Sequence, residues 1–154
     1  MEPVDLRGVV ETSWEQVSSE EARLQVNDFA KADHASGDPP PKAAVFLAHE
    51  GRLHQLLENL FRNAVDHAGP KVTVTVGQTD EGFFVADDGP GIPADKREKI
   101  FEPRYSSTGK GTGVGLSIAS MIARSHGWNL SVTESAAGGA RFDISSVQRP
   151  TRQT

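Results

Sequence analysis

Residues 50–67 limit the possible folds more than any other segment of the chain. Their apolar side chains recur every three or four positions, which places them along one face of a helix. The stripe consists of Leu53, Leu56, Leu57, Leu60, Phe61, Ala64 and Val65. Gly69 and Pro70 then end the helix. Because only one face is apolar, we expect this helix to cover another layer of structure.

The sequence predicts two pairs of strands that could form this layer. Valines alternate with threonines at 72–76, and a turn at 80–82 leads into a second strand at 83–86, as in a hairpin. A second pair is expected at 129–134 and 140–146. Since the members of each pair are adjacent in the chain, we expect them to pair antiparallel.

The remaining segments add two helices and a short strand. Apolar spacing predicts helices at 5–17 and 114–126, and a short strand that contains Leu24 and Val26. Residues 31–42 contain three prolines and a Gly-Asp pair, and are expected to be a loop. The predicted fold class is α/β: a two-layer sandwich with a mixed, largely antiparallel sheet that helices cover on one face.

The composition excludes several classes of protein. The 154 residues suffice for one domain, and a formal net charge of -5 offers no basic excess for nucleic acid or an anionic membrane. The absence of cysteine excludes a disulfide framework and a thiolate metal site, and fits a reducing compartment. No apolar run approaches the roughly 20 residues that span a bilayer. We therefore expect a cytoplasmic domain without direct membrane contact, and any membrane anchor of the intact protein would lie outside these residues.

Two asparagines on the helix at 50–67 are candidates for metal binding. Asn59 and Asn63 are four positions apart and project from the same face. An amide oxygen suits Mg²⁺, particularly when phosphate groups supply the other ligands. The alternative is a pair of exposed helix asparagines without a function.

A turn rich in Asp and Gly follows the strand at 83–86. Asp87 stands at the strand end, where its carboxylate could accept a hydrogen bond from an exocyclic amine such as that of adenine. Gly89 and Gly91 permit tight backbone turns and the close approach of a ligand. Asp and Gly also form ordinary β-turns, so this segment has a purely structural alternative.

A glycine-rich run at 109–116 leads directly into the helix at 114–126. Its backbone N–H groups, together with the helix N-terminus, could converge on an anion, and Lys110 could add a full positive charge. The order of residues is not that of a Walker loop. Without a ligand, the same run would serve as a flexible linker.

Together these segments resemble the GHKL ATPase superfamily and, within it, the catalytic domain of sensor histidine kinases. The resemblance covers about residues 5–147. The matching segments are the N box at 59–64, the G1 box at 87–93, the F box at 100–105, the G2 box at 111–117 and a late glycine-rich hairpin at 138–142.

The resemblance implies a Bergerat-type ATP-binding fold that holds ATP with Mg²⁺. Asn63 would hold the ion, Asn59 would lie near the phosphates or the ion, and Lys110 would contact the γ-phosphate; these three are the implied catalytic residues. The ATP lid would span about 93–112, with Phe101 packing it down. The implied nucleotide-binding residues are Asn59, Asn63, His67, Asp87, Gly89, Gly91, Ile92, Phe101, Gly111, Thr112, Gly113, Val114, Gly115 and Leu116.

Two departures from the family pattern bear on the reaction. Many such kinases carry a basic residue and a tyrosine where this chain has Asp66 and His67. His67 would either donate to a phosphate or simply end the helix, where a partly charged imidazole is favourable. Relatives that hydrolyse ATP carry a glutamate at the position of Asn59, and Glu58 is rotated from it by about 100° around the helix. We therefore expect poor hydrolysis, as suits a kinase.

The implied function is transfer of the γ-phosphoryl group to a histidine on a dimerisation domain absent from this chain, with a response regulator as an indirect partner. The alternatives are a degenerate nucleotide-binding docking module and a GHKL-type ATPase or serine kinase. Residues 1–149 are expected to form the domain and 150–154 a disordered tail. We expect the chain by itself to be a monomer that binds no nucleic acid and does not phosphorylate itself.

Overall fold

The computed structural model describes residues 2–17, 20–26, 45–69, 71–79, 81–97, 99–101, 115–136 and 138–147. The strands are β1 (Glu2–Asp5), β2 (Arg23–Val26), β3 (Val45–Ala48), β4 (Thr73–Gln78), β5 (Phe83–Asp87), β6 (Asn129–Glu134) and β7 (Ala140–Ser145). The α-helices are α1 (Leu6–Val17), α2 (Glu50–Ala68) and α3 (Gly115–Ser125). Two short 3₁₀ turns, Ala94–Lys96 and Lys99–Phe101, lie between β5 and α3.

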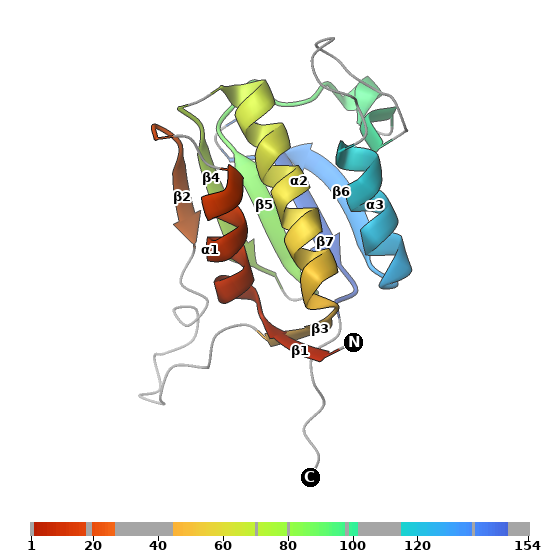
Figure 1. Cartoon of the computed structure of the whole chain (residues 1–154). Coiled ribbons are helices and arrows are strands. Elements are labelled where there is room, and N and C mark those ends of the chain that lie inside the picture. Colours follow the sequence, from red (N-terminus) through yellow and green to blue (C-terminus); the bar gives the residue numbers. More distant parts are fainter. Residues whose placement is uncertain are drawn as a thin grey trace, which may run out of the picture.

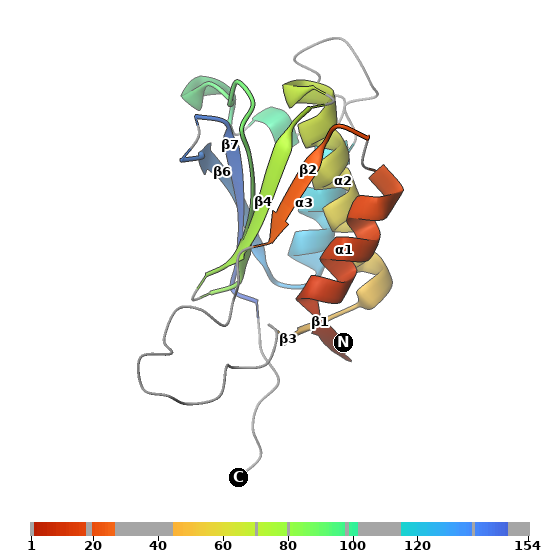
Figure 2. The same ribbon diagram turned by 90° about the vertical axis from the view of Figure 1, so that its left-hand side faces the viewer.

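A five-stranded sheet forms one layer, in the order β2-β4-β5-β7-β6. β2 pairs parallel with β4, and the other neighbours are antiparallel. All three α-helices lie on one face of this sheet (Figure 1), and the view from the side shows the two layers (Figure 2). The predicted two-layer sandwich with a mixed, largely antiparallel sheet is confirmed.

The core lies between the helices and the sheet, and both sequence periodicities point into it. The apolar stripe of α2 is buried except for Val65, which is partly buried. From β4, Val74 and Val76 are fully buried, whereas Thr73 and Thr75, which alternate with them, are partly exposed. Each fully buried apolar side chain contributes about 1.5–3 kcal/mol relative to an exposed one. This burial fixes the orientation of α2 and therefore the direction of its polar face.

Both tryptophans belong to the packing. Trp14 on α1 makes an edge-to-face contact with Phe61 on α2, with ring centroids 5.3 Å apart. Trp128, which precedes β6, is buried and lies against the ring of His126 with centroids 4.3 Å apart. The first contact connects α1 to α2, whereas the second lies within the connection between α3 and β6.

A two-stranded sheet at the edge of the helical layer was not predicted from the sequence. β1 pairs antiparallel with β3, with Glu2 opposite Ala48 and Asp5 opposite Val45. Within β1, Val4 alone is buried, so the strand lacks the alternation that would announce it. The helix predicted at 5–17 began one residue early, because Asp5 belongs to β1 and α1 begins at Leu6.

The segment between β5 and α3 includes two short 3₁₀ turns and no α-helix among its described residues. Pro93 precedes the first turn, and Ile100 is the one buried residue within the two. One buried side chain gives too little apolar contact to hold a longer α-helix against the core. The expected loop at 31–42 and the expected tail at 150–154 lie outside the described residues.

A histidine connects the start of α2 to the end of α3. The backbone N–H of His49 donates to Nε2 of His126 over 3.1 Å, and Nδ1 of His126 lies 2.8 Å from the carbonyl oxygen of Ile122. Because a carbonyl only accepts, Nδ1 must carry the proton and Nε2 must accept. The ring thereby connects the backbone before α2 to the last turn of α3.

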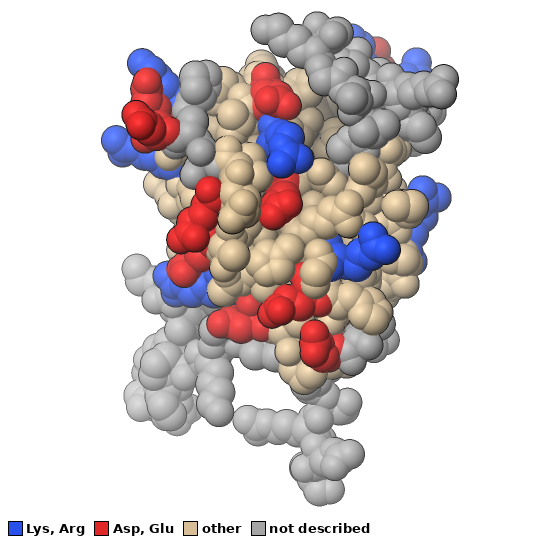
Figure 3. All heavy atoms as spheres, in the orientation of Figure 1, with Lys and Arg blue, Asp and Glu red and all other residues tan. Residues whose placement is uncertain are grey.

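The described part of the helical face carries both acidic and basic side chains, and several acidic ones lie close together toward its lower end (Figure 3). Among the described residues, no helix has both the length and the apolar character needed to cross a membrane.

Candidate functional site

The C-terminal ends of α2 and β5 and the N-terminal end of α3 meet at one end of the molecule (Figure 1). This arrangement follows from the chain order, because α2 and β5 run toward that end and α3 runs away from it. The G1 box therefore lies against the C-terminal end of α2, where a Cβ at Gly89 would meet Ala68. Asn63 and Asn59 lie earlier on the same helix. Of the G2 box, Gly115 and Leu116 begin α3 at this same end. The other predicted residues of this segment lie outside the described residues: Lys110, which precedes the box, and Gly111, Thr112, Gly113 and Val114 within it.

Asp87 is the last residue of β5, and it is 92% buried, with an exposed fraction of 8%. Its Oδ1 accepts a hydrogen bond from the N–H of Gly89 over 2.9 Å and another from the N–H of Ala140 over 3.1 Å. Oδ2 of Asp87 has no hydrogen-bond partner among the described residues. One oxygen of the carboxylate is therefore held by the backbone, and the other is available to a further donor.

Burial is the largest influence on the acidity of Asp87, and it raises the pKa above the ordinary value of 3.8. The N–H groups of Gly89 and Ala140 act in the opposite direction, the charge of Asp88 adds to the rise, and His67 lowers the pKa slightly. The net result is a raised pKa. Burial thus disfavours the ionised form of Asp87. A ligand that donates a hydrogen bond to the ionised carboxylate would stabilise that form strongly.

The hairpin formed by β6 and β7 also holds Asp87 in place. This contact was not predicted from the sequence. The hydroxyl of Ser135 donates to the backbone carbonyl of Asp87 over 2.8 Å and accepts from the N–H of Gly139 over 2.8 Å. Ser135 and Asp87 are 48 positions apart. No local spacing could have related them, although the resemblance of 138–142 to a family hairpin marked the neighbourhood.

Three glycines of the site allow backbone segments to approach one another. A Cβ at Gly139 would collide with the carbonyl and carboxylate oxygens of Asp87, and a Cβ at Gly89 would collide with Ala68 at the end of α2. Gly91 has a φ of 77°, and a Cβ there would lie 2.8 Å from the carbonyl oxygen of Gly138. Protein atoms therefore already exclude a side chain at each position.

Asn59 and Asn63 lie on the same face of α2, as predicted, and both are partly buried. The side-chain Nδ2 of Asn59 is buried and has no hydrogen-bond partner among the described residues. Such an unsatisfied group costs about 1–3 kcal/mol. An acceptor oxygen, such as that of a phosphate group, would remove this cost. The amide of Asn59 therefore fits a ligand that offers an acceptor oxygen.

The described residues contain no group of three histidine or acidic side chains that could hold a metal ion. An ion near Asn63 would thus draw most of its ligands from water and from a bound anion. Mg²⁺ behaves in this way when it is bound through phosphates.

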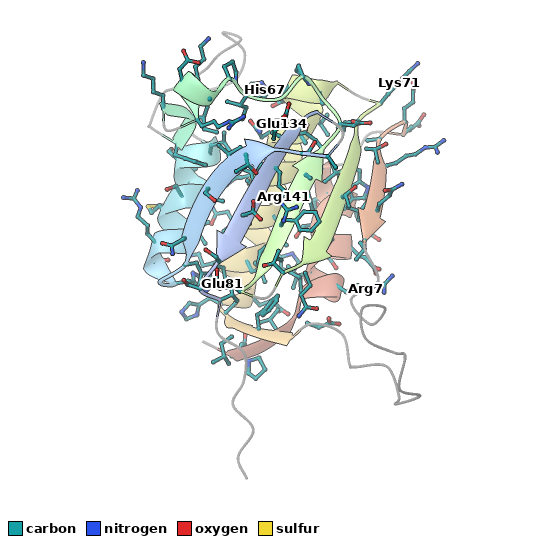
Figure 4. The ribbon with its side chains drawn as sticks, turned by 180° about the vertical axis from the view of Figure 1, so that it is seen from behind. Arg7, His67, Lys71, Glu81, Glu134 and Arg141 are labelled. Carbon is teal, nitrogen blue, oxygen red and sulfur yellow. The ribbon has the colours of Figure 1, made fainter. Side chains whose placement is uncertain are left out.

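The other predicted residues surround this centre. His67 is exposed at the end of α2 and is labelled at the site end of the molecule in Figure 4. The carbonyl of Ile92 accepts from Nε of Arg97 over 3.1 Å, and Phe101 contacts Phe142 edge-to-face with centroids 6.2 Å apart. Phe101 thereby anchors the end of the 3₁₀ segment to the core.

Comparisons with known proteins agree with this geometry. The profile of the family described as histidine kinase-, DNA gyrase B- and HSP90-like ATPases matches residues 48–150. The sensor histidine kinase ZraS of Escherichia coli O157:H7 is 30% identical over 154 residues, covering 94% of this chain and 31% of ZraS. The signal transduction histidine-protein kinase AfsQ2 of Streptomyces coelicolor is 37% identical over 106 residues, or 64% of this chain and 20% of AfsQ2. The chain thus spans about a third or less of these relatives.

Solved structures show the same fold. The mycobacterial sensor histidine kinase MprB superimposes with a TM-score of 0.78 at 25% identity, covering 97% of this chain and all of that one. Full-length ShkA in complex with AMPPNP has a TM-score of 0.70 at 30% identity, covering 98% of this chain and 32% of that one. The chain therefore belongs to the family of histidine kinase-, DNA gyrase B- and HSP90-like ATPases, as an ATP-binding catalytic domain of the sensor histidine kinase type.

Proposed function

We propose that the chain binds ATP with Mg²⁺ where α2, β5 and α3 meet, and presents the γ-phosphoryl group to a histidine on a dimerisation domain outside these residues. A response regulator would receive the phosphoryl group from that histidine. The observation that carries the proposal is the carboxylate of Asp87, which is buried and has Oδ1 bound to two backbone N–H groups while Oδ2 has no described partner.

In this proposal, Oδ2 of Asp87 accepts a hydrogen bond from the exocyclic amine of adenine. The unsatisfied amide of Asn59 supports a place for phosphate oxygens beside α2. Asn63, four residues further along the same face, would bind Mg²⁺, which would neutralise charge on the phosphates. His67 would donate to a phosphate from the end of α2. The start of α3 would direct backbone N–H groups and its dipole at the phosphates.

The residues favour transfer to a protein acceptor over hydrolysis. Phosphoryl transfer depends mainly on positioning and on stabilisation of charge. Removing a proton from an attacking water requires a base, and the amide of Asn59 cannot serve as one. Glu58 lies about 100° away around α2, so its carboxylate does not share that face.

Equilibrium binding tests the proposal. We expect ATP with Mg²⁺ to stabilise the wild-type chain, by about 2.7 kcal/mol at 100 times the dissociation constant. Asp87→Ala should weaken ATP binding by about tenfold or more, because a charge-assisted hydrogen bond is lost. Glu134→Gln, which removes an exposed carboxylate on β6, is the matched control and should bind ATP normally. Undiminished affinity in Asp87→Ala would contradict the proposal.

A further inference from the structure

Ser135 uses all of its hydrogen-bonding groups in the turn between β6 and β7. Its backbone N–H donates to the carbonyl of Gly139 over 2.7 Å, and its own carbonyl accepts from the N–H of Gly138 over 2.9 Å. Its hydroxyl accepts from the N–H of Gly139 and donates to the backbone carbonyl of Asp87, each over 2.8 Å. The side chain is buried, so water does not offer replacement partners.

These bonds connect the turn to the nucleotide-facing carboxylate by two routes. The hydroxyl of Ser135 holds the main chain of Asp87 directly. It also holds Gly139, and the next residue, Ala140, donates its N–H to Oδ1 of Asp87 over 3.1 Å. The closeness of Gly139 to Asp87, which leaves no space for a Cβ, means that a small displacement of the turn would change both contacts.

We propose that Ser135 is a positioning residue for adenine recognition: its hydroxyl fixes the turn that occupies Oδ1 of Asp87, so that Oδ2 is left for the exocyclic amine. The inference rests on the proposed nucleotide site at Asp87. It assigns Ser135 a share in base selectivity, although the residue itself need not touch the nucleotide.

The acidity of Asp87 supports this role. The Ala140 N–H is one of the two backbone groups that oppose the rise in the pKa of Asp87 caused by burial. Asp88 adds to that rise and His67 acts against it, and neither depends on the turn. Without the Ser135 hydroxyl, the Ala140 contact should weaken and the pKa should rise further. The ionised acceptor would then be lost at a higher pH.

A purely structural role for Ser135 makes a different prediction. A turn that only stabilises the domain would, when loosened, weaken all nucleotides equally or lower stability alone. A role through Asp87 should instead weaken only ligands that carry the exocyclic amine. Purine riboside triphosphate, which lacks that amine but keeps the ring and the phosphates, separates the two roles.

The experiment measures the affinity of the 154-residue chain for ATP and for purine riboside triphosphate, both with Mg²⁺, by calorimetry. We expect wild type to prefer ATP by about tenfold, and Ser135→Ala to lose about tenfold in ATP affinity while binding the analogue within about twofold of wild type. The midpoint of the acid limb of ATP binding should also move to higher pH. Ser13→Ala is the control, because Ser13 is fully buried and hydrogen-bonded to His54 far from Asp87. It should leave both affinities unchanged.

Ser135→Cys, similar in size but with a weaker donor, provides a second variant if Ser135→Ala folds poorly. It should show the same selective loss at a smaller size, about threefold. Equal loss for both ligands, or unchanged ATP affinity, in the folded variants would overturn the role of Ser135 while leaving Asp87 in place. If wild type itself did not distinguish the two ligands, the proposed contact at Asp87 would fail, and the inference with it.

Discussion

At the scale of single residues, Asp87 places a requirement for binding in conflict with stability. Its carboxylate is buried, and burial raises its pKa above the ordinary value of 3.8. A group whose pKa is higher in the folded state contributes stability at pH values below its unfolded pKa, and this contribution is lost as the pH rises through the folded pKa. The ionised side chain therefore costs stability at neutral pH, where the proposed hydrogen bond to adenine needs the charge.

Asp87→Asn tests this conflict. The neutral amide can keep an acceptor toward Gly89 and Ala140 but loses the charge that burial penalises. We expect the stability of the variant relative to wild type to increase as the pH rises from about 4 to 7, while ATP affinity falls. Thermal unfolding across this range, with Glu134→Gln as the exposed control, measures the effect. If the stability of Asp87→Asn relative to wild type decreased as the pH rose, the raised pKa of Asp87 would be contradicted.

Gly139 and Gly51 form an informative pair of glycines. A methyl group at Gly139 would collide with Asp87, whereas one at Gly51, in the first turn of α2, would meet nothing within 4 Å. We expect Gly139→Ala to cost about 1–3 kcal/mol and to weaken ATP binding, because the turn must move. Gly51→Ala should leave stability unchanged or raise it by up to about 1 kcal/mol. Denaturant unfolding decides, and an equal effect of the two substitutions would refute the close approach at Gly139.

At the scale of elements, the sequence predicted those segments whose periodicity is long or regular. α2, β4 and β5 were placed nearly to their ends because burial of one face determines each of them. β1 and β3 were missed because four-residue strands with little alternation carry no local signal. The site divides in the same way: Asp87 and Asn59 stand in recognisable segments. The contact of Ser135 with Asp87, in contrast, exists only after β7 has paired with β5.

The connection between α2 and α3 through His126 can be tested by stability. Replacing His126 with alanine would leave the backbone N–H of His49 without its partner. It would also remove the imidazole ring that packs against Trp128. We expect a loss of about 1–3 kcal/mol. Arg124→Ala, two residues earlier and exposed, should stay within about 0.5 kcal/mol of wild type. Comparable losses in the two variants, measured by urea unfolding, would argue against the bridge.

At the scale of the whole molecule, the fold separates its two ends. One end brings together α2, β5 and α3 around Asp87, and the other is closed by the β1–β3 pair and the contact between His49 and His126 (Figures 1 and 4). The open face of the sheet carries Arg141, whose guanidinium lies 4.0 Å from the ring centre of Phe84 and pairs with Asp143. The proposed contact with adenine at Asp87 therefore lies at one end of the sandwich.

The chain by itself should bind ATP without using it rapidly. Asn59 offers no base for water, and we place the histidine acceptor outside these residues. Incubation with γ-labelled ATP and Mg²⁺ should leave almost no acid-labile phosphate on the protein and release phosphate only slowly. Rapid, Mg²⁺-dependent phosphate release would favour an ATPase, and acid-labile labelling of the chain would place an acceptor within it.

A crystal structure with an ATP analogue and Mg²⁺ tests the central claim most directly. We expect the exocyclic nitrogen of adenine about 2.7–3.2 Å from Oδ2 of Asp87, with Oδ1 still bound to the N–H groups of Gly89 and Ala140. An analogue bound at this end of the molecule with its amine turned away from Asp87, or bound elsewhere on the chain, would contradict the account.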